Sequence, residues 1–277
     1  AGTAVADCTD AGACTSVPVT GRLGSDFTAI TLPNGTRRAY FVDISPNAGT
    51  KSVSSAACST AACTAVGTST VAAAELIVSQ NVKAWGVPDA VVTPDGKVRL
   101  YVVESPVEGN CTEKLASYIS SDGISFTKEA GWRLEGGYVD TEVLRAKDGD
   151  WIMVMADGPG CGDRVQKLYM STSNDGLTWA KPQKISGSDL RRLDPTGYEV
   201  SANVFRVYYA TAVAGALGDV TYTIKRGTIA IKQSSAEVAI TGGKKATTKT
   251  TITCIKGKTT KKVTGVNPKC PSGFKKK

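Results

Sequence analysis

Apolar and polar positions follow one another in a unit that recurs four times along the chain. Each unit starts with an acidic residue and continues through a short apolar strand, a polar turn and a second apolar strand. The alternation within the strands has the period of two that is typical of β-structure. The units begin about 50 to 60 residues apart, a repeat length that indicates the blades of a propeller when every element is a strand. Their first residues are Asp26, Asp89, Asp140 and Asp194.

This pattern predicts an all-β chain with a β-propeller at residues 1–240. If the four units are equivalent, their acidic residues lie at the same end of equivalent inner strands and surround one central pocket. Residues 120–126 and 173–179 share a further signal, Ser-x-Asp-Gly-x-x-aromatic. An Asp-Gly pair supplies a tight turn with positive φ. We therefore interpret these segments as the turn between the third and fourth strands of a blade, with the aromatic side chain packed between blades.

The composition shifts towards Thr, Lys and Gly after Gln233. We expect a linker at residues 241–250 and a basic hairpin at residues 251–277. From residue 244 onwards there are eleven Lys and no acidic residue, whereas the whole chain has a net charge of +8. Residues 1–243 are therefore net acidic, which argues against nucleic-acid binding by the propeller. The Lys-rich segment either binds an anionic cell envelope electrostatically or is a solvated end.

The eight Cys residues are typical of a protein that folds in an oxidising compartment. Two short segments that each contain a pair of Cys resemble each other, and both are interpreted as disulfide-closed turns. Two further Cys fall in the same loop of adjacent repeats, which leaves one pair in the C-terminal segment. The alternative, a zinc site with four Cys ligands, lacks the CxxC pairs that such sites usually contain. The predicted disulfides are Cys8–Cys14, Cys58–Cys63, Cys111–Cys161 and Cys254–Cys270.

The chain contains no His. This excludes Ser-His-Asp nucleophiles and His-ligated metal sites, so acid–base chemistry must come from carboxylates, Tyr, Lys or Cys. No apolar run is long enough to form a transmembrane segment. The sequence starts without Met, like a mature chain whose signal peptide has been removed. We therefore expect a secreted or cell-surface protein.

Several features together resemble the five-bladed propellers of the arabinanase, invertase and levansucrase superfamily, which includes glycoside hydrolase families 43 and 32. They are inner strands that start with Asp-Pro or Pro-Asp, Asp-Gly turns, and the Ser-x-Asp-Gly-x-x-Phe/Trp segments. Residues 173–179 are also similar to a sialidase Asp-box. The resemblance covers about residues 26–232 and implies five blades, although only four inner strands can be traced. A fifth blade would combine residues 1–22 with part of 218–240, and four blades is the alternative.

In those hydrolases, carboxylates on successive inner strands supply a base or nucleophile, an Asp that tunes a pKa, and an acid. The resemblance implies these roles for Asp26, for Asp89, and for Glu142 or Asp140. The chain departs from the family pattern because Glu142 lacks a Glu-Gly-Pro or Glu-Cys context and Asp26 is not followed by Pro. Contacts to a sugar ligand are expected from Trp85, Tyr138, Asp194, Tyr198 and Arg164.

The acidic residues also have a structural interpretation. Each could cap its own strand or bond the backbone of a neighbouring blade, since the motif occurs in four repeats whereas catalysis needs only two or three carboxylates. A structural Ca²⁺ held by several carboxylates on the propeller axis is a third interpretation. No other metal and no cofactor is expected.

Two hypotheses for the function follow. The first is a secreted, glycan-active propeller that hydrolyses a polysaccharide with its inner-strand carboxylates. The second is a non-catalytic propeller that binds glycan or forms part of the cell surface. The carboxylates and the aromatic residues favour the first, and the absent Glu-Gly-Pro context favours the second. The extreme C-terminus resembles a short tail of secreted actinobacterial proteins, which implies a surface-retention element.

Overall fold

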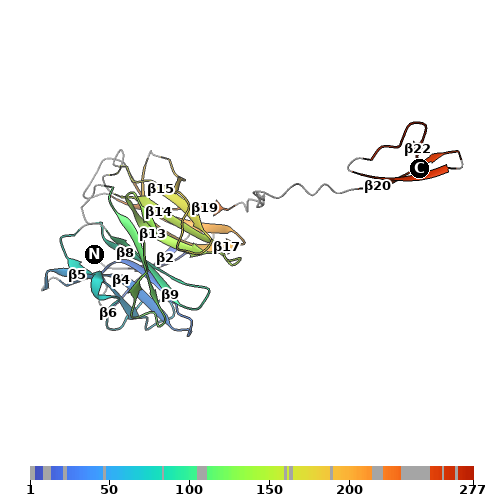
Figure 1. Cartoon of the computed structure of the whole chain (residues 1–277). Coiled ribbons are helices and arrows are strands. Elements are labelled where there is room, and N and C mark those ends of the chain that lie inside the picture. The colour runs from blue at the N-terminus through green and yellow to red at the C-terminus, as the bar shows by residue number, and fades with distance from the viewer. Residues whose placement is uncertain are drawn as a thin grey trace. The chain divides into compact units, whose positions relative to one another are not determined.

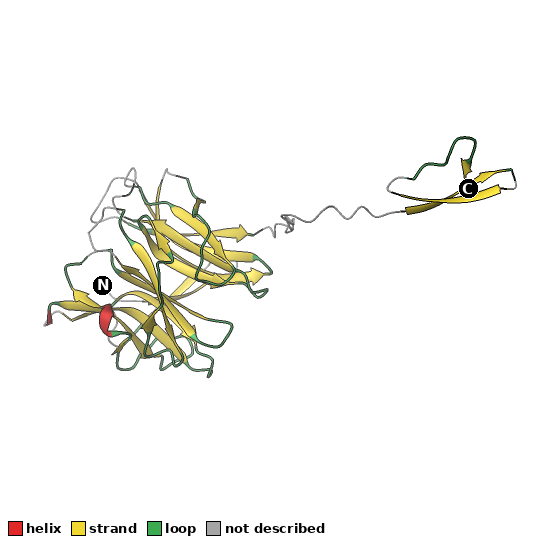
Figure 2. Cartoon of the chain, in the orientation of Figure 1, coloured by secondary structure: helices red, strands yellow, loops and turns green. Residues whose placement is uncertain are grey.

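The computed structural model describes residues 4–8, 14–20, 24–45, 48–82, 84–104, 111–158, 161, 165–187, 190–213, 221–231, 250–257, 259–265 and 268–277. The chain divides into two compact units, Ala1–Lys232 and Gln233–Lys277, so the first unit ends before the boundary expected near residue 240. Both units consist almost entirely of strands and loops (Figure 2). No helix in the described parts of the chain has the length and apolar character that crossing a bilayer requires.

The first unit is a β-propeller, and its four largest antiparallel sheets follow one another along the chain (Figure 1). We call these sheets blades 1 to 4 in chain order. Each blade starts with the inner strand that carries one of the predicted acidic residues. Blade 1 contains β3 (Ser25–Thr31), β4 (Arg37–Ser45), β5 (Thr50–Ala57), β6 (Thr70–Val71) and β7 (Ile77–Ser79), with the 3-10 turn η2 (Ala74–Leu76) before β7. Blade 2 contains β8 (Gly86–Val92), β9 (Val98–Glu104), β10 (Lys114–Ser120), β11 (Thr127–Lys128) and β12 (Leu134–Glu135). Blade 3 contains β13 (Tyr138–Arg145), β14 (Trp151–Asp157), β15 (Leu168–Ser173) and β16 (Gln183–Lys184), and blade 4 contains β17 (Leu190–Ser201), β18 (Val204–Val213) and β19 (Thr223–Ala230).

The inner strands pack in the order β3, β8, β13 and β17, each beside the next. A fifth blade was expected from residues 1–22 together with strands near the end of the unit. Within the residues that the structure describes, β1 (Ala4–Cys8) and β2 (Cys14–Pro18) pair only with each other. The segment after β2 joins blade 1, because the Thr20 amide donates a 2.8 Å hydrogen bond to the Thr64 carbonyl. The described part of the propeller therefore contains four blades and a separate hairpin.

The two Asp-Gly turns have the predicted structure and also connect adjacent blades. In blade 2, the Asp122 carboxylate accepts hydrogen bonds from the amides of Ile124 and Ser125, at 2.8 and 3.0 Å. The carbonyl of Gly123, the turn glycine, accepts a 2.8 Å hydrogen bond from the Tyr40 hydroxyl of blade 1.

The turn in blade 3 repeats this arrangement, because the Tyr101 hydroxyl of blade 2 donates to the Gly176 carbonyl at 2.7 Å. The aromatic residue after each turn packs edge-on against the Tyr whose hydroxyl bonds that turn. The ring centroids of Phe126 and Tyr40 are 5.8 Å apart, and those of Trp179 and Tyr101 are 6.2 Å apart. The prediction that these aromatic side chains pack between blades is confirmed.

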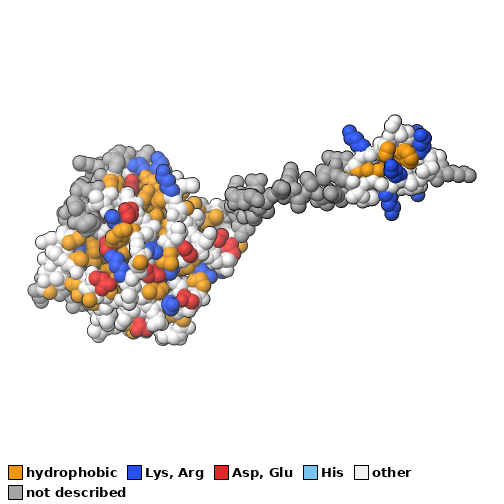
Figure 3. Space-filling view, in the orientation of Figure 1, with side chains coloured by type: hydrophobic (Ala, Val, Ile, Leu, Met, Phe, Trp, Pro, Cys, Tyr) orange, Lys and Arg blue, Asp and Glu red, His pale blue; other side chains and the backbone are white. Residues whose placement is uncertain are grey.

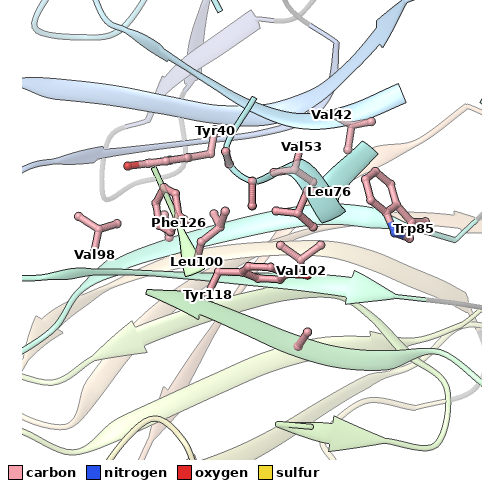
Figure 4. Close-up of a cluster of buried hydrophobic side chains, with 14 of the residues drawn as sticks. Tyr40, Val42, Val53, Leu76, Trp85, Val98, Leu100, Val102, Tyr118 and Phe126 are labelled. Atoms are coloured by element: carbon pink, nitrogen blue, oxygen red, sulfur yellow. The ribbon is translucent and has the colours of Figure 1, made fainter. Parts of the chain in front are cut away.

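Apolar side chains between blades 1 and 2 form the core shown in Figure 4. Blade 1 contributes Tyr40 and Val53, while blade 2 contributes Leu100 and Tyr118, and all four are almost fully buried. Leu76 of η2 fills the same layer. The strand β9 is buried on both faces, so alternate residues belong to different layers: Leu100 lies in this core and Tyr101 in the next cluster, with side chains of blade 3.

Three of the four predicted disulfides lie among the described side chains. Their Cα–Cα distances are 4.8, 5.2 and 5.6 Å for Cys58–Cys63, Cys111–Cys161 and Cys254–Cys270. The Cys111–Cys161 bond joins the loop before β10 of blade 2 to the loop after β14 of blade 3, as the repeat predicts. Cys8 and Cys14 are cross-strand partners in the β1–β2 pair, but their side chains lie outside the described ones.

The C-terminal unit is a small sheet closed by Cys254–Cys270. Its strands lie in the order β21 (Thr259–Gly265), β20 (Thr250–Lys256) and β22 (Lys275–Lys276). The predicted hairpin is therefore present, with the last lysines added as a third short strand. Figure 3 shows basic side chains, and no acidic ones, on the visible surface of this unit.

Candidate functional site

The four predicted acidic residues line one cavity of about 400 Å³ in the propeller. Every inner strand contributes three consecutive residues to its wall. These residues are Asp26, Phe27 and Thr28 from β3, Val87, Pro88 and Asp89 from β8, Asp140, Thr141 and Glu142 from β13, and Asp194, Pro195 and Thr196 from β17. We call this cavity the acidic pocket, because Glu142 brings the number of its carboxylates to five.

A β-bulge in each inner strand creates the pocket. The strand pairing is interrupted between Ser25 and Thr28 in blade 1, and the other three inner strands are interrupted at the corresponding place. A bulge bends its strand and redirects a side chain, and the extra residue often takes the left-handed backbone conformation. Here the residues with positive φ are Asp26 (56°), Val87 (41°), Asp140 (51°) and Asp194 (48°).

The repeat suggested that Asp26, Asp89, Asp140 and Asp194 are equivalent, but the bulges show that Asp89 is not equivalent to the other three. The first paired residues after the bulge are Thr28, Asp89, Glu142 and Thr196, each opposite the middle of its neighbouring strand. Asp89 therefore corresponds to Glu142, and Val87 is the counterpart of Asp26, Asp140 and Asp194. The sequence records this shift in the distance to the following turn. Asp89 lies six positions before Asp95, whereas Asp26 lies eight positions before Asn34 and Asp140 eight positions before Asp148.

Asp89 lies deepest in the pocket, with 4% of its surface exposed. One carboxylate oxygen accepts a 2.6 Å hydrogen bond from the Val143 amide of blade 3, and the other accepts a 3.2 Å hydrogen bond from the Thr28 hydroxyl of blade 1. Asp89 thus connects three blades. Burial, only partly offset by these hydrogen bonds, raises the pKa of Asp89 to about 7.

Glu142 repeats this role one blade further on. Its carboxylate accepts hydrogen bonds from the Gly197 amide at 3.0 Å and the Thr196 hydroxyl at 3.3 Å, both in blade 4. Burial and then the charge of Asp89 raise the pKa of Glu142 well above its ordinary value. The surroundings of this carboxyl therefore favour its protonated form, and its side chain is half-buried at the pocket wall.

The left-handed residues form a second layer of carboxylates. Burial and the charges of Asp194 and Asp26 raise the pKa of Asp140 well above its ordinary value, although the Asp194 amide donates a hydrogen bond to it. Burial and the charge of Asp26 raise the pKa of Asp194 to about 6. Desolvation raises the pKa of Asp26 too, but a hydrogen bond from Ser25 and the charge of Lys51 oppose the rise. Asp26 and Asp194 are exposed, so water screens both of them.

Thr141 is an uncharged polar residue of the pocket wall that is almost fully buried. It lies between Asp140 and Glu142, and only 5% of its surface is exposed. Its hydroxyl has no hydrogen-bond partner among the described residues. A buried hydroxyl without a partner costs free energy, so this group favours a ligand that can donate or accept a hydrogen bond there.

The aromatic contacts predicted from the sequence do not line the acidic pocket. Trp85 is 6% exposed and belongs to the core between blades 1 and 2, where Lys51 lies 5.4 Å from its ring centroid. Tyr138 lines a different cavity of about 360 Å³ and packs against Tyr169. Tyr198 is exposed on β17 and stacks on Tyr208. Arg164 lies outside the described residues. Trp85, Tyr138 and Tyr198 are therefore not among the described residues that line the acidic pocket, and their contacts with a sugar stay predictions.

No group of three or more Asp, Glu or Cys side chains in the described ranges is arranged to hold a metal ion. The five carboxylates come from four strands, and three of them, Asp89, Asp140 and Glu142, are already hydrogen-bonded to the next blade. The structural Ca²⁺ suggested by the sequence stays a prediction.

No family model matches the sequence, and no curated protein matches it. Solved structures with a similar fold include a thermostable family-43 glycoside hydrolase, which is 14% identical with a TM-score of 0.50 over 72% of this chain and 69% of that chain. An α-L-arabinanase of Penicillium chrysogenum is 13% identical, with a TM-score of 0.51 over 71% and 63%. A family-93 α-L-arabinofuranosidase of Fusarium graminearum is 16% identical, with a TM-score of 0.50 over 75% and 62%. The chain spans less than two thirds of the length of the last two proteins. The structural similarity establishes the fold of this chain.

Proposed function

We propose that the chain is a glycan-active propeller that hydrolyses a glycosidic bond in the acidic pocket. The observation that carries this proposal is the concentration of five carboxylates from four inner strands in one cavity, where burial raises the pKa of Glu142 well above its ordinary value while other groups oppose the rise at Asp26. Paired carboxylates with different protonation states are the standard machinery of glycoside hydrolysis. The structural neighbours are named as glycoside hydrolases, an arabinanase and an arabinofuranosidase, and this supports the same reaction class.

Glu142 is proposed as the acid, because burial and the charge of Asp89 raise its pKa well above its ordinary value and so favour the protonated form. It would give its proton to the glycosidic oxygen as the bond to the departing sugar breaks. Asp26 is proposed as the base or nucleophile, since burial raises its pKa but a hydrogen bond from Ser25 and the charge of Lys51 oppose that rise. As a base, Asp26 would take a proton from the water whose oxygen bonds to the anomeric carbon. As a nucleophile, it would bond to that carbon itself before water releases the sugar.

Asp89 is proposed to act through Glu142 and not on the substrate. Its charge raises the pKa of Glu142, and its bond to the Val143 amide holds the strand next to that residue. Asp140 and Asp194, at the left-handed positions, are proposed to contact the substrate. Asp140 is the second candidate for the acid, because its pKa is also raised well above the ordinary value.

Release of reducing sugars from a panel of polysaccharides tests the proposal. We expect activity from the wild type and a reduction in kcat/KM of about 100- to 10,000-fold in Glu142→Gln and Asp26→Asn. Glu135→Gln is the matched control, because Glu135 is an exposed carboxylate that pairs with Lys114 outside the pocket. Analysis of the first product anomer by NMR distinguishes retention from inversion. Wild-type activity that survives both pocket substitutions would refute the assignment.

A non-catalytic glycan-binding or cell-surface protein of the same fold is the second candidate. The observation that favours it is that Asp89 and Glu142 each bond the backbone of the next blade, which is a structural use of the carboxylates. Glycan binding without turnover across the panel would support this candidate over the first.

The C-terminal unit, proposed as residues 251–277 after a linker at 241–250, would attach the protein to an anionic cell envelope. The exposed lysines of β21 and β22, Lys261, Lys262, Lys275 and Lys276, carry this proposal. Secretion is consistent with the disulfides. We expect cosedimentation with bacterial envelopes that salt abolishes, and its loss when residues 244–277 are removed. Binding that is independent of salt would contradict an electrostatic attachment.

A further inference from the structure

The acidic pocket is unusual for a glycan site because its described lining contains no basic residue. Five carboxylates face the cavity, and neither Lys nor Arg is among the described residues that line it. The charge of Lys51 in β5 acts on Asp26 alone among the five. A neutral sugar would leave the excess of negative charge in the pocket uncompensated, and a sugar acid would increase that excess.

The carboxylates also destabilise one another. Asp26 acts on Asp140 and Asp194, while Asp194 acts on Asp140 and Asp89 acts on Glu142. Without a ligand, the pocket relieves this repulsion by keeping protons. A bound positive charge would relieve it as well, so binding of a cation should release protons from the pocket.

The geometry favours an organic cation over a metal ion. No three of the described carboxylates are arranged as metal ligands, whereas an ammonium group on a larger ligand can interact with carboxylates that are spread over four strands. The buried Thr141 hydroxyl, which has no partner among the described residues, requires in addition a neutral hydrogen-bonding group. A ligand that carries both an ammonium group and hydroxyl groups meets both requirements.

We propose that the acidic pocket binds glycans that carry free amino groups, and that it selects them over neutral or N-acetylated glycans. The carboxylates of Asp140 and Asp194 face the ammonium group, and the Thr141 hydroxyl bonds a hydroxyl of the same sugar. This inference rests on the proposal that the pocket is a glycan site. It concerns binding and does not require that the bound glycan is hydrolysed.

Isothermal titration calorimetry of the full chain with a β-1,4-glucosamine tetramer and with its N-acetylated form tests the inference. We expect the amino form to bind at least about tenfold more tightly at pH 6, where most of its amines carry a proton. Its apparent enthalpy at this pH should vary with the ionisation enthalpy of the buffer, because protons leave the pocket for the buffer when the ligand is already charged. The affinity should fall as the pH drops below about 6, where the carboxylates are increasingly protonated.

Substitutions separate this pocket from other acidic surfaces. Asp140→Asn and Asp194→Asn keep the shape of the side chain, and Asn tolerates the left-handed backbone at both positions. We expect each to remove most of the preference for the amino tetramer while affinity for the N-acetylated form changes less than twofold. Glu135→Gln, outside the pocket, should leave the preference intact.

The outcomes are distinguishable. Equal affinity for the two tetramers, no binding of either, or a preference that survives both pocket substitutions would overturn the inference. Competition by spermidine as strong as that by the amino tetramer would also overturn it, because the site would then recognise any organic cation. Tight binding of the amino tetramer without release of reducing sugar would end the hydrolase proposal and leave this inference standing. Hydrolysis of neutral glycans without a preference for the amino form would support the hydrolase proposal and overturn this inference.

Discussion

Replacement of Asp89 by Asn should stabilise the propeller at high pH and leave its stability almost unchanged at low pH. Asp89 is almost fully buried, and burial raises its pKa from 3.8 to about 7. Since each pKa unit corresponds to about 1.4 kcal/mol, ionisation of Asp89 in the folded protein costs up to about 4 kcal/mol. Between these two pKa values the folded state binds more protons than the unfolded state. The contribution of Asp89 to stability is therefore fully present below pH 4 and is lost as the pH rises towards 7.

Asn has the shape of Asp but cannot ionise. Its amide oxygen can accept the bond from Val143 and its NH2 can donate to the Thr28 hydroxyl, as the protonated carboxyl of Asp89 can. We therefore expect the wild type and Asp89→Asn to be about equally stable at pH 3. At pH 8 the variant should be the more stable protein, by up to about 4 kcal/mol, because it avoids the buried charge.

Urea unfolding followed by tryptophan fluorescence measures this pH dependence. All four Trp residues lie in the propeller unit, so the signal does not report the C-terminal unit. Glu135→Gln serves as the control, because Glu135 is an exposed carboxylate outside the pocket whose ion pair contributes little to stability. A difference between wild type and Asp89→Asn that is the same at pH 3 and pH 8 would refute the reasoning. It would mean that Asp89 titrates like an exposed carboxyl.

Two further predictions concern the contacts that join adjacent blades. Tyr40→Phe should cost about 1–3 kcal/mol in urea unfolding, because the buried Gly123 carbonyl loses its 2.8 Å hydrogen bond. Tyr101→Phe should cost less, since the Gly176 carbonyl keeps a 3.1 Å hydrogen bond from the Trp179 indole, and equal costs would contradict this ranking. Replacement of both Cys111 and Cys161 by Ser should lower the free energy of unfolding by about 4 kcal/mol, because the bond closes a loop with a sequence separation of 50. An unchanged urea midpoint in that double variant would contradict this prediction, because it would show that the disulfide constrains neither the folded nor the unfolded state.

The features that the sequence predicts well are those with a local signature. The Asp-Gly turns are an example, because the Asp122 carboxylate bonds the amides that follow it in the chain. The pairing of Cys111 with Cys161 could be predicted since a repeat places both in equivalent loops. The convergence of Asp26, Asp140 and Asp194 on one pocket follows from the same repetition.

The features that could not be predicted depend on the backbone conformation or on distant contacts. Val87 adopts the left-handed conformation of its bulge although a β-branched residue disfavours it, so the bulge itself could not be inferred. The distance from Asp89 to its turn, two positions shorter than in blades 1 and 3, records only the shift. Trp85 is buried by packing against blade 1 and η2, from segments that are distant in the sequence. Thr141 was missed because only the structure reveals a hydroxyl that is both buried and without a described partner.

The bulges explain why the acidic residues serve both structure and chemistry. At the position after the bulge, Asp89 and Glu142 each accept the amide of the next inner strand, so their side chains stabilise the contacts between blades 2, 3 and 4. At the left-handed position, Asp26 and Asp194 make no such bond and are exposed to solvent in the pocket. A substitution at Asp89 therefore changes folding and activity together and cannot by itself identify a catalytic group. The exposed pair gives the cleaner test, because loss of activity in a folded Asp26→Asn protein can be attributed to the chemistry of the pocket.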